Sequence, residues 1–231
     1  MLFIDNNDIT EKGAGAIAEC LKNKQDLRVL NLDNNTIGPN GAKLIAEQLK
    51  NNFGLSKLYC DNNEIGEVGC EAIAQSMEMM DSLKKICLEN NNIRDKGAIA
   101  LAKCLEENDT LLSVYLENNS IGRDGAVALG EMFSNKFKLS KLNINSNPIG
   151  DEGFKSIANG LAEIETLRNF TMADCNLTQV SIPYLSKCLI NKRFMTQLVL
   201  DNNRIGQVGA KLLADGIRDN ETMTDLRIAN C

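Results

Sequence analysis

Histidine and tryptophan are absent from this 231-residue sequence, and proline and tyrosine occur only three times each. Without histidine, the chain has no imidazole to serve as a general base or a metal ligand. Its formal net charge of −6 lacks the basic surplus typical of nucleic-acid-binding domains. No apolar run approaches the roughly 18 residues of a membrane-spanning helix, and no secretory signal peptide opens the chain. We therefore expect a cytoplasmic protein that binds neither nucleic acid nor membrane.

What the sequence has instead is a repeat of 28 residues. Its frame is L-x-x-L-x-L-x-x-N-x-I, followed by G-x-x-G-A-x-x-I-A-x-x-L. The tail of an earlier copy lies between Leu2 and Ile9. A fixed period of this length is typical of a solenoid, in which each unit buries its apolar face against its neighbours. The first apolar position recurs eight times without insertion or deletion, at Leu27, Leu55, Leu83, Leu111, Leu139, Leu167, Met195 and Met223.

Each repeat reads as a strand, a turn and a helix. In the first copy, strand-like alternation directs Leu30 and Leu32 to the core and Val29 away from it. The asparagine that follows, Asn35, is expected to be buried and to bond orphaned backbone groups of the turn. Parallel strands stack about 4.8 Å apart, whereas helices need 8–10 Å, so the stack must bend with its strands inside. This predicts a right-handed α/β solenoid, a horseshoe of about eight repeats with a parallel inner sheet and outer helices.

The frame and its period closely resemble the ribonuclease-inhibitor-like class of leucine-rich repeats, over essentially the whole chain. The resemblance implies the horseshoe fold and a non-catalytic module that binds a protein partner on its concave strand face. The same class occurs in ribonuclease inhibitor, the sensor region of NOD-like receptors, Ran GTPase-activating protein and tropomodulin-like actin regulators, so the resemblance is poorly specific for function. The alternatives are therefore a regulator of a GTPase or the sensor region of a NOD-like receptor.

The unbroken repeat predicts a single domain over residues 1–231. Neither end carries a cap, because the chain begins within a strand at Met1 and stops at Cys231, in the asparagine slot of the last copy. Solenoids normally cover the apolar edge of a terminal repeat. We therefore expect a piece of a longer protein, or self-association or a larger assembly through these ends.

The cysteines are expected to be free thiols. No two of the eight share a phase in adjacent repeats, so no pair comes within the Cα separation that a disulfide allows. Free thiols are typical of a reducing compartment. Six N-x-S/T sequons argue the other way, and we treat them as chance in a chain rich in Asn, Ser and Thr. Cys87 is expected to point outward from its strand.

The outward strand positions form columns on the predicted concave face. The first column is acidic over five repeats, a second holds lysines, and a third between them holds tyrosines and Cys87. Exposed tyrosine beside charge is typical of interface hot spots. The alternative is a solvated ladder of charges inherited with the repeat. We predict a patch for a protein partner with basic residues, formed by Lys57, Tyr59, Asp61, Lys85, Cys87, Glu89, Tyr115 and Glu117.

No catalytic residue, cofactor site or metal site is predicted. Calcium needs six or more converging oxygens, whereas a straight column offers at most two carboxylates per gap. A serine or cysteine nucleophile has no histidine to activate it. We therefore expect a protein that is not an enzyme.

Repeat six departs from the frame between Asn176 and Leu185. Thr178 and Ser181 replace its two glycines, and Pro183 follows. This predicts a local change in the helix, and both a functional site and simple drift are consistent with it. The loops that return from helix to strand carry apolar residues that should cover the underside of the core or form a small exposed patch: Phe53, Met79, Met80, Phe137 and Phe194.

Overall fold

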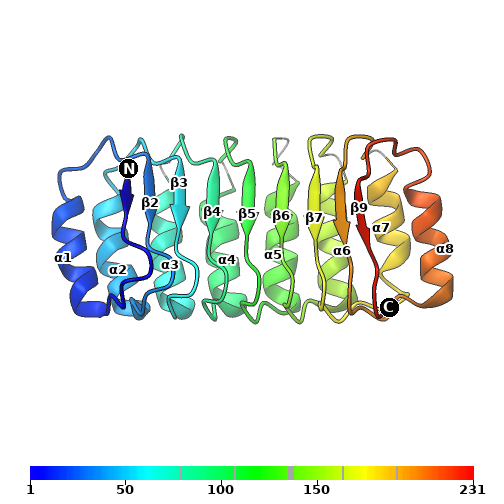
Figure 1. Ribbon diagram of the computed structural model, residues 1–231, viewed down its shortest axis with the longest axis horizontal. Coiled ribbons are helices and arrows are strands. Elements are labelled where there is room, and N and C mark those ends of the chain that lie inside the picture. Colours follow the sequence, from blue (N-terminus) through cyan, green and yellow to red (C-terminus); the bar gives the residue numbers. More distant parts are fainter. Residues whose placement is uncertain (79, 107, 135–137, 163, 191) are drawn as a thin grey trace.

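A computed structural model describes residues 1–78, 80–106, 108–134, 138–162, 164–190 and 192–231. Within these ranges, one parallel sheet runs in chain order from β1 to β9, and a helix follows each strand except the last (Figure 1). The strands are β1 (Leu2–Phe3), β2 (Val29–Asn31), β3 (Lys57–Tyr59), β4 (Lys85–Cys87), β5 (Ser113–Tyr115), β6 (Lys141–Asn143), β7 (Asn169–Thr171), β8 (Gln197–Val199) and β9 (Asp225–Arg227). The helices are α1 (Glu11–Leu21), α2 (Gly38–Leu49), α3 (Gly66–Met77), α4 (Arg94–Cys104), α5 (Arg123–Phe133), α6 (Gly150–Leu161), α7 (Ile182–Leu189) and α8 (Gly206–Gly216).

The constant repeat length fixes the register of the sheet. Every strand pairs with the next at an offset of one repeat, as Leu30 with Leu58 and Leu58 with Ile86. Equivalent residues therefore lie side by side across the sheet. The helices spread over a wider span than the strands (Figure 1), which gives the predicted arc with strands on its hollow side. The predicted α/β solenoid of about eight repeats is confirmed.

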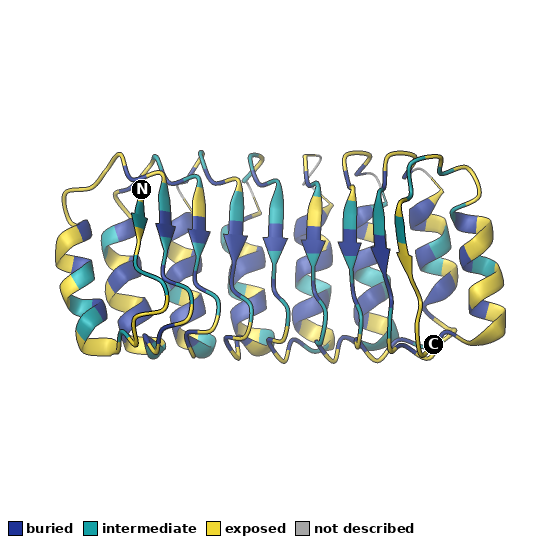
Figure 2. Ribbon diagram, in the orientation of Figure 1, coloured by how far each residue is buried: buried dark blue, intermediate teal, exposed yellow. Residues whose placement is uncertain are grey.

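The core lies between the sheet and the helices (Figure 2). Leu30, Leu58 and Leu142 represent a continuous buried column of strand residues, and Ile45 and Leu49 meet them from helix α2. Val29 and Asn31 stay half-exposed on the concave side, as the alternation predicts. Across the described ranges, no helix is both long and apolar enough to cross a lipid bilayer.

A ladder of buried asparagines joins the turns at the ends of the strands. The Oδ1 atom of Asn119 accepts hydrogen bonds from the backbone N–H groups of Asn91 (2.9 Å) and Ile93 (3.4 Å). Its Nδ2 atom donates to the carbonyl oxygens of Leu88 (2.7 Å) and Leu116 (3.0 Å). Each such side chain therefore bonds backbone groups of its own turn and of the turn before it, as predicted. The ladder consists of Asn35, Asn63, Asn91, Asn119, Asn147 and Asn203.

Cys175 interrupts this ladder. Its Sγ atom donates to the carbonyl oxygens of Ile144 and Ala173, each 3.3 Å away. A thiol is only a weak acceptor, and the N–H of Ile149 donates instead to the carbonyl oxygen of Asn147, at 2.7 Å. Cys175 thus keeps the donor half of the asparagine's role, whereas Ile149 N–H bonds a backbone carbonyl in place of a side chain.

Glycines bring neighbouring helices together. A Cβ atom added at Gly41 would lie 2.8 Å from Cβ of Ala14 in the preceding helix and 2.7 Å from Cγ2 of Ile37. The closest approach is between α5 and α6, where a Cβ at Gly160 would lie 2.0 Å from the carbonyl oxygen of Gly130. These positions therefore have no room for a larger residue.

Repeat six shows the predicted local change. Helix α7 is eight residues long, against eleven or twelve in the other helices. The hydroxyl groups of Thr178 and Ser181 donate to the carboxylate of Asp151, and so does the N–H of Thr178, at 2.8 Å. The carboxylate of Asp95 in repeat three likewise accepts from the N–H groups of Gly122 and Gly125 in repeat four. In repeat six, two hydroxyl side chains thus add hydrogen bonds to a contact that Asp95 makes with backbone N–H groups alone.

The return loops differ from the prediction in part. Met80 is buried, but Phe53 and Phe194 are more than half exposed, at 58% and 54%. The ring of Phe194 lies beside the guanidinium of Arg168, with 5.7 Å between the guanidinium carbon and the ring centroid. These two phenylalanines therefore do not cover the core, and the exposed alternative applies to them. Met79 and Phe137 lie outside the described residues.

Candidate functional site

Three columns of side chains run across the concave face of strands β3 to β5. The register aligns Lys57 with Lys85, and Tyr59 with Cys87 and Tyr115. The acidic column lies two residues further along each repeat, at Asp61, Glu89 and Glu117. The eight residues predicted to form a binding patch therefore lie on one side of the sheet, where Lys57 is exposed, Cys87 is buried and the other six are half-buried.

Two tyrosines hold a lysine at the centre of this surface. The Nζ atom of Lys85 lies 4.7 Å from the ring centroid of Tyr59 and 4.7 Å from that of Tyr115. At this distance a cation is attracted to the face of an aromatic ring. Its charge also lowers the pKa values of Asp33, Asp61 and Glu89, although burial has the larger effect and raises them.

Cys87 differs from its predicted exposure. It lies in the tyrosine column but is only 4% exposed. Its neighbours in that column are Tyr59 and Tyr115, which hold Lys85 between them, and these larger side chains cover the small thiol. Burial, followed by repulsion from Asp61, raises the pKa of Cys87 to about 12. The thiol is therefore neutral at physiological pH and offers a partner no contact surface of its own.

The acidic column has a structural role that the sequence analysis missed. One carboxylate oxygen of Asp33 accepts a hydrogen bond from the N–H of Asp61 (2.7 Å), and Asp61 accepts one from the N–H of Glu89 (2.6 Å). Asn145 and Asp201 do the same for Ala173 and Ala229, so an amide can replace the carboxylate. A short acceptor at this position therefore bonds the backbone of the next repeat.

Burial and mutual repulsion raise the pKa values of these carboxyl groups. Burial raises the pKa of Asp61 to about 7; the hydrogen bond from Glu89 N–H opposes this rise, and the charges of Asp33 and Glu89 add to it. Burial also raises the pKa of Asp33. For Glu89, burial and then repulsion from Glu117 raise the pKa, although the amide of Asn143 donates to both carboxylates at 2.9 Å. A cationic group from outside would relieve this repulsion.

The described residues contain no group of three or more His, Cys, Asp or Glu side chains placed to hold a metal ion. All eight cysteines are free thiols. Burial raises the pKa of Cys175 to about 12 and that of Cys188 to about 11. Their thiols are therefore poor nucleophiles at neutral pH.

Comparison with known proteins agrees with the repeat and the fold. The leucine-rich-repeat family model matches residues 23–46, 82–102, 135–158 and 191–214. The chain is a leucine-rich-repeat solenoid. Among solved structures, it is similar to "Leiomodin-1 Actin-Binding Site 2 (ABS2)", with 19% sequence identity and a TM-score of 0.53 over 63% of this chain and 86% of that one. That likeness concerns the fold. A search of curated proteins finds no match.

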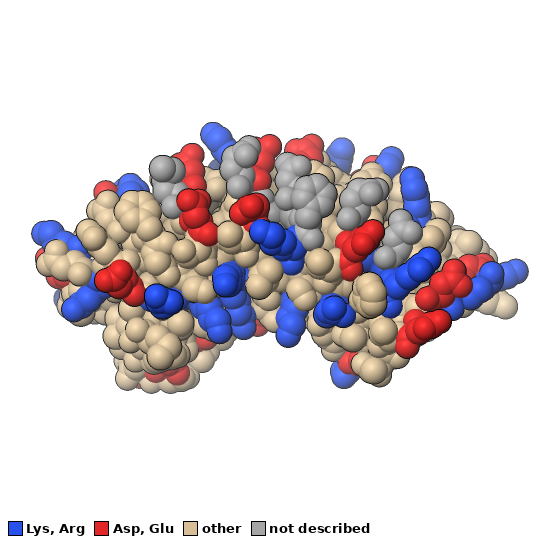
Figure 3. Space-filling model, turned by 90° about the horizontal axis from the view of Figure 1, so that it is seen from above, with Lys and Arg blue, Asp and Glu red and all other residues tan. Residues whose placement is uncertain are grey.

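The concave face of this leucine-rich-repeat domain separates charge across its width. The acidic column follows the carboxyl ends of the strands. Exposed cations gather at the opposite edge, where the strands begin, and Figure 3 shows a row of Lys and Arg side chains along that edge. The lysines within the strands were predicted to lie on this face, whereas the cationic residues just before the strands were not. The row consists of Arg28, Lys57, Lys84, Lys141 and Arg168.

The second half of the concave face is rich in amides. Asn169 donates to Gln197 (2.9 Å), and Gln197 donates to Asp225 (2.8 Å). Thr171 donates to Asn143 (2.8 Å), which bridges to the acidic column. This part of the leucine-rich-repeat domain thus carries an internally bonded polar network beside a hollow of about 330 Å³.

A second asparagine column borders the acidic one. Asn62, Asn90 and Asn118 have positive φ angles of 55°, 56° and 52°, a region that asparagine tolerates better than most residues. The amide of Asn62 donates to Asn34, and that of Asn118 donates to Asn90, each at 2.7 Å. The signal for this column was in the sequence, because the buried asparagine is preceded by another asparagine in most repeats.

Proposed function

We propose that this domain is a non-catalytic interaction module whose concave strand face holds a protein partner with basic residues. Leucine-rich-repeat domains generally bind proteins, and stacked repeats build extended concave surfaces for that purpose. The rigid strand array lowers the ordering cost of binding because its side chains are already held in place.

The cluster of Tyr59, Lys85 and Tyr115 is the observation that carries the proposal. Two half-exposed aromatic rings on a rigid sheet provide contact area at low entropic cost. The adjoining column of Asp33, Asp61 and Glu89 has raised pKa values because its carboxyl groups are partly buried and, to a smaller extent, because their charges repel one another. A lysine or arginine of the partner would stabilise these carboxylates.

The test is affinity capture from a cell extract, with the recovered partner identified and then purified. The double variant Tyr59→Ala/Tyr115→Ala should lose most of the recovery, since interface aromatic residues commonly contribute about 2 kcal/mol or more each. Tyr184→Ala is the matched control, because the remaining tyrosine of the chain lies on helix α7. Equal recovery by the wild type and the double variant would remove the patch as the binding surface.

A further inference from the structure

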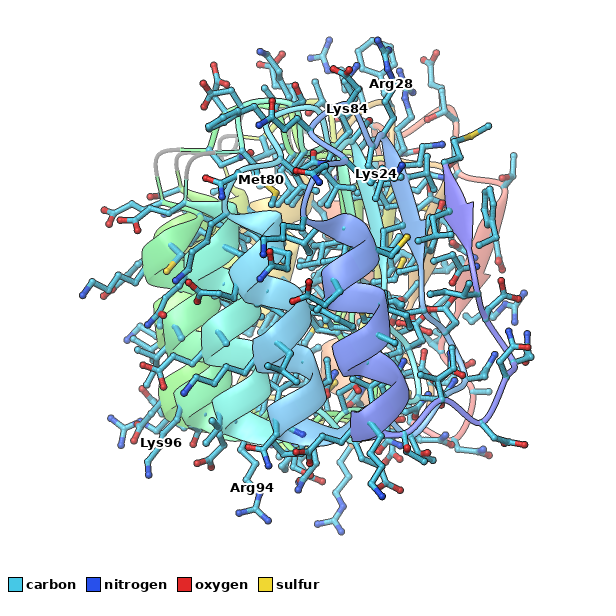
Figure 4. The ribbon with its side chains drawn as sticks, turned by 90° about the vertical axis from the view of Figure 1, so that its left-hand side faces the viewer. Lys24, Arg28, Met80, Lys84, Arg94 and Lys96 are labelled. Carbon is cyan, nitrogen blue, oxygen red and sulfur yellow. The ribbon has the colours of Figure 1, made fainter. Side chains whose placement is uncertain are left out.

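A hollow opens in the cationic row, where the strands of the first repeats begin. It measures about 330 Å³, and its lining includes Arg28, Gly54, Ser56, Ser82 and Lys84. Figure 4 shows Arg28 and Lys84 together at this edge of the molecule, with Lys24 close by. The hollow adjoins the proposed binding surface because Lys84 directly precedes strand β4.

Backbone pairing sets the width of the hollow. Ser56 N–H donates to the carbonyl oxygen of Arg28, and Lys84 N–H donates to that of Ser56, each at 2.9 Å. The three residues therefore lie side by side on consecutive repeats. The backbones of Arg28 and Lys84 are about 10 Å apart, which is two strand spacings. The short side chain of Ser56 lies between them. Two long cationic side chains thus flank a gap whose lining includes Ser56.

Gly54 keeps this gap open. The equivalent position in three other repeats is threonine, at Thr110, Thr166 and Thr222. A Cβ at Gly54 would lie 3.3 Å from the carbonyl oxygen of Gln25. A side chain there would therefore fill part of the hollow beside the backbone of Asp26.

The charges of the hollow are available to a ligand. Arg28 and Lys84 are exposed, and within the described ranges neither forms an ion pair or a side-chain hydrogen bond. Asp26 and Asp81 also line the hollow and are likewise outside any ion pair there. They oppose a doubly charged phosphate more strongly than a singly charged carboxylate.

We propose that this hollow binds the carboxylate of an aspartate or glutamate side chain on the protein partner. The inference rests on the proposed function and specifies the partner further. A partner segment that crosses the strands would carry acidic side chains toward Arg28 and Lys84. It would carry basic side chains toward Asp33, Asp61 and Glu89, at the opposite edge of the same face.

The test uses a hexaglutamate peptide and the full chain, with binding followed by amide chemical shifts in NMR spectra. Shifts should centre on Arg28, Ser56 and Lys84. The variant Arg28→Gln/Lys84→Gln should raise the dissociation constant of the peptide roughly three- to tenfold. Arg94→Gln/Lys96→Gln is the control, since it removes one arginine and one lysine at the opposite edge (Figure 4). Equal weakening by both variants would overturn the assignment.

Two further experiments test whether binding depends on the space beside Gly54 and whether the hollow prefers a carboxylate to a phosphate. Gly54→Thr leaves the charge unchanged and should weaken peptide binding, because the side chain occupies the hollow. Inorganic phosphate at the same concentration should give smaller shifts at Arg28 and Lys84 than the peptide. Larger shifts with phosphate would overturn the assignment to a carboxylate.

Failure of the carboxylate site can be distinguished from failure of the proposed function. If the peptide avoids the hollow while capture still depends on Tyr59 and Tyr115, the carboxylate site is wrong and the proposed function stands. If capture does not depend on the tyrosines, the proposed function fails whatever the peptide does.

Discussion

Adjacent asparagines in the same turn have different tasks. Asn119 is fully buried and bonds backbone groups of two repeats, whereas Asn118 is exposed and holds a left-handed backbone conformation. The side-chain amide is needed in the first case because no water reaches the orphaned groups. In the second case, backbone conformation matters more than the side chain.

We therefore predict that Asn119→Ala lowers the free energy of unfolding by at least about 3 kcal/mol, since it leaves several buried donors and acceptors without partners. Asn118→Gly should change it by less than about 1 kcal/mol, because glycine accepts a positive φ. Urea unfolding, monitored by circular dichroism, measures the free energy of unfolding of both variants. Equal losses in the two variants would contradict the assigned roles.

Asp61 combines a structural hydrogen bond with an unfavourable charge. Its carboxylate accepts the N–H of Glu89, but burial raises its pKa from 3.8 to about 7. Between these two values the unfolded chain has lost the proton while the folded chain keeps it. The contribution of Asp61 to stability is therefore complete below about pH 4 and is lost as the pH rises to about 7.

The variant Asp61→Asn should thus gain stability relative to wild type as the pH rises through this window. Asparagine keeps the acceptor for Glu89 N–H, as Asn145 does for Ala173 N–H, and it does not titrate. Thermal unfolding at about pH 5 and about pH 8 measures the difference. A difference between variant and wild type that does not grow with pH would show that Asp61 is charged throughout.

At the scale of elements, the contact between helices α5 and α6 is the tightest in the stack. Gly160→Ala would place a methyl group against the backbone carbonyl of Gly130, so we expect a loss of about 2–3 kcal/mol in the free energy of unfolding. Gly15→Ala in α1 is the control. Its added Cβ would meet Leu44 at an ordinary 3.7 Å, and alanine should stabilise the helix by about 0.5–1 kcal/mol. Denaturant midpoints that shift in the same direction would contradict this packing.

The order, type and register of the elements could be predicted from the sequence because the constant period requires equivalent residues to lie side by side. The prediction was weaker where several side chains decide the outcome together. The burial of Cys87 depends on its larger neighbours Tyr59, Lys85 and Tyr115, and strand alternation alone places it outside. The exposure of Phe53 could not be read from its apolar character.

Contacts between repeats were the hardest to predict. The carboxylate of Asp151 belongs to helix α6 but receives its hydrogen bonds from Thr178 and Ser181 of the next repeat. Burial raises its pKa, yet these hydrogen bonds outweigh that effect, and the pKa lies below its usual value. From the sequence alone, an acidic residue at a helix start indicates only an interaction with that helix's own dipole. Its partners are 27 and 30 residues away in the sequence, and they come into contact with Asp151 only when the repeats stack.

At the scale of the whole molecule, the arc presents one continuous face with cations where the strands begin and carboxylates where they end. Charge arranged in this way orients a partner as well as attracting it. Because Asp61 has a pKa of about 7, the acidic edge gains charge between about pH 6 and about pH 8. We expect a basic partner to bind more tightly at the upper end of this range, and Asp61→Asn should reduce that pH dependence.

The most direct test of the central claim is hydroxyl-radical footprinting of the complex with the captured partner. The three tyrosines of the chain provide the readout, because Tyr59 and Tyr115 lie on the concave face and Tyr184 lies on helix α7. We predict that the partner slows oxidation of Tyr59 and Tyr115 and leaves that of Tyr184 unchanged. Protection of Tyr184 with unchanged oxidation of Tyr59 and Tyr115 would place the partner on the helical side and contradict the account.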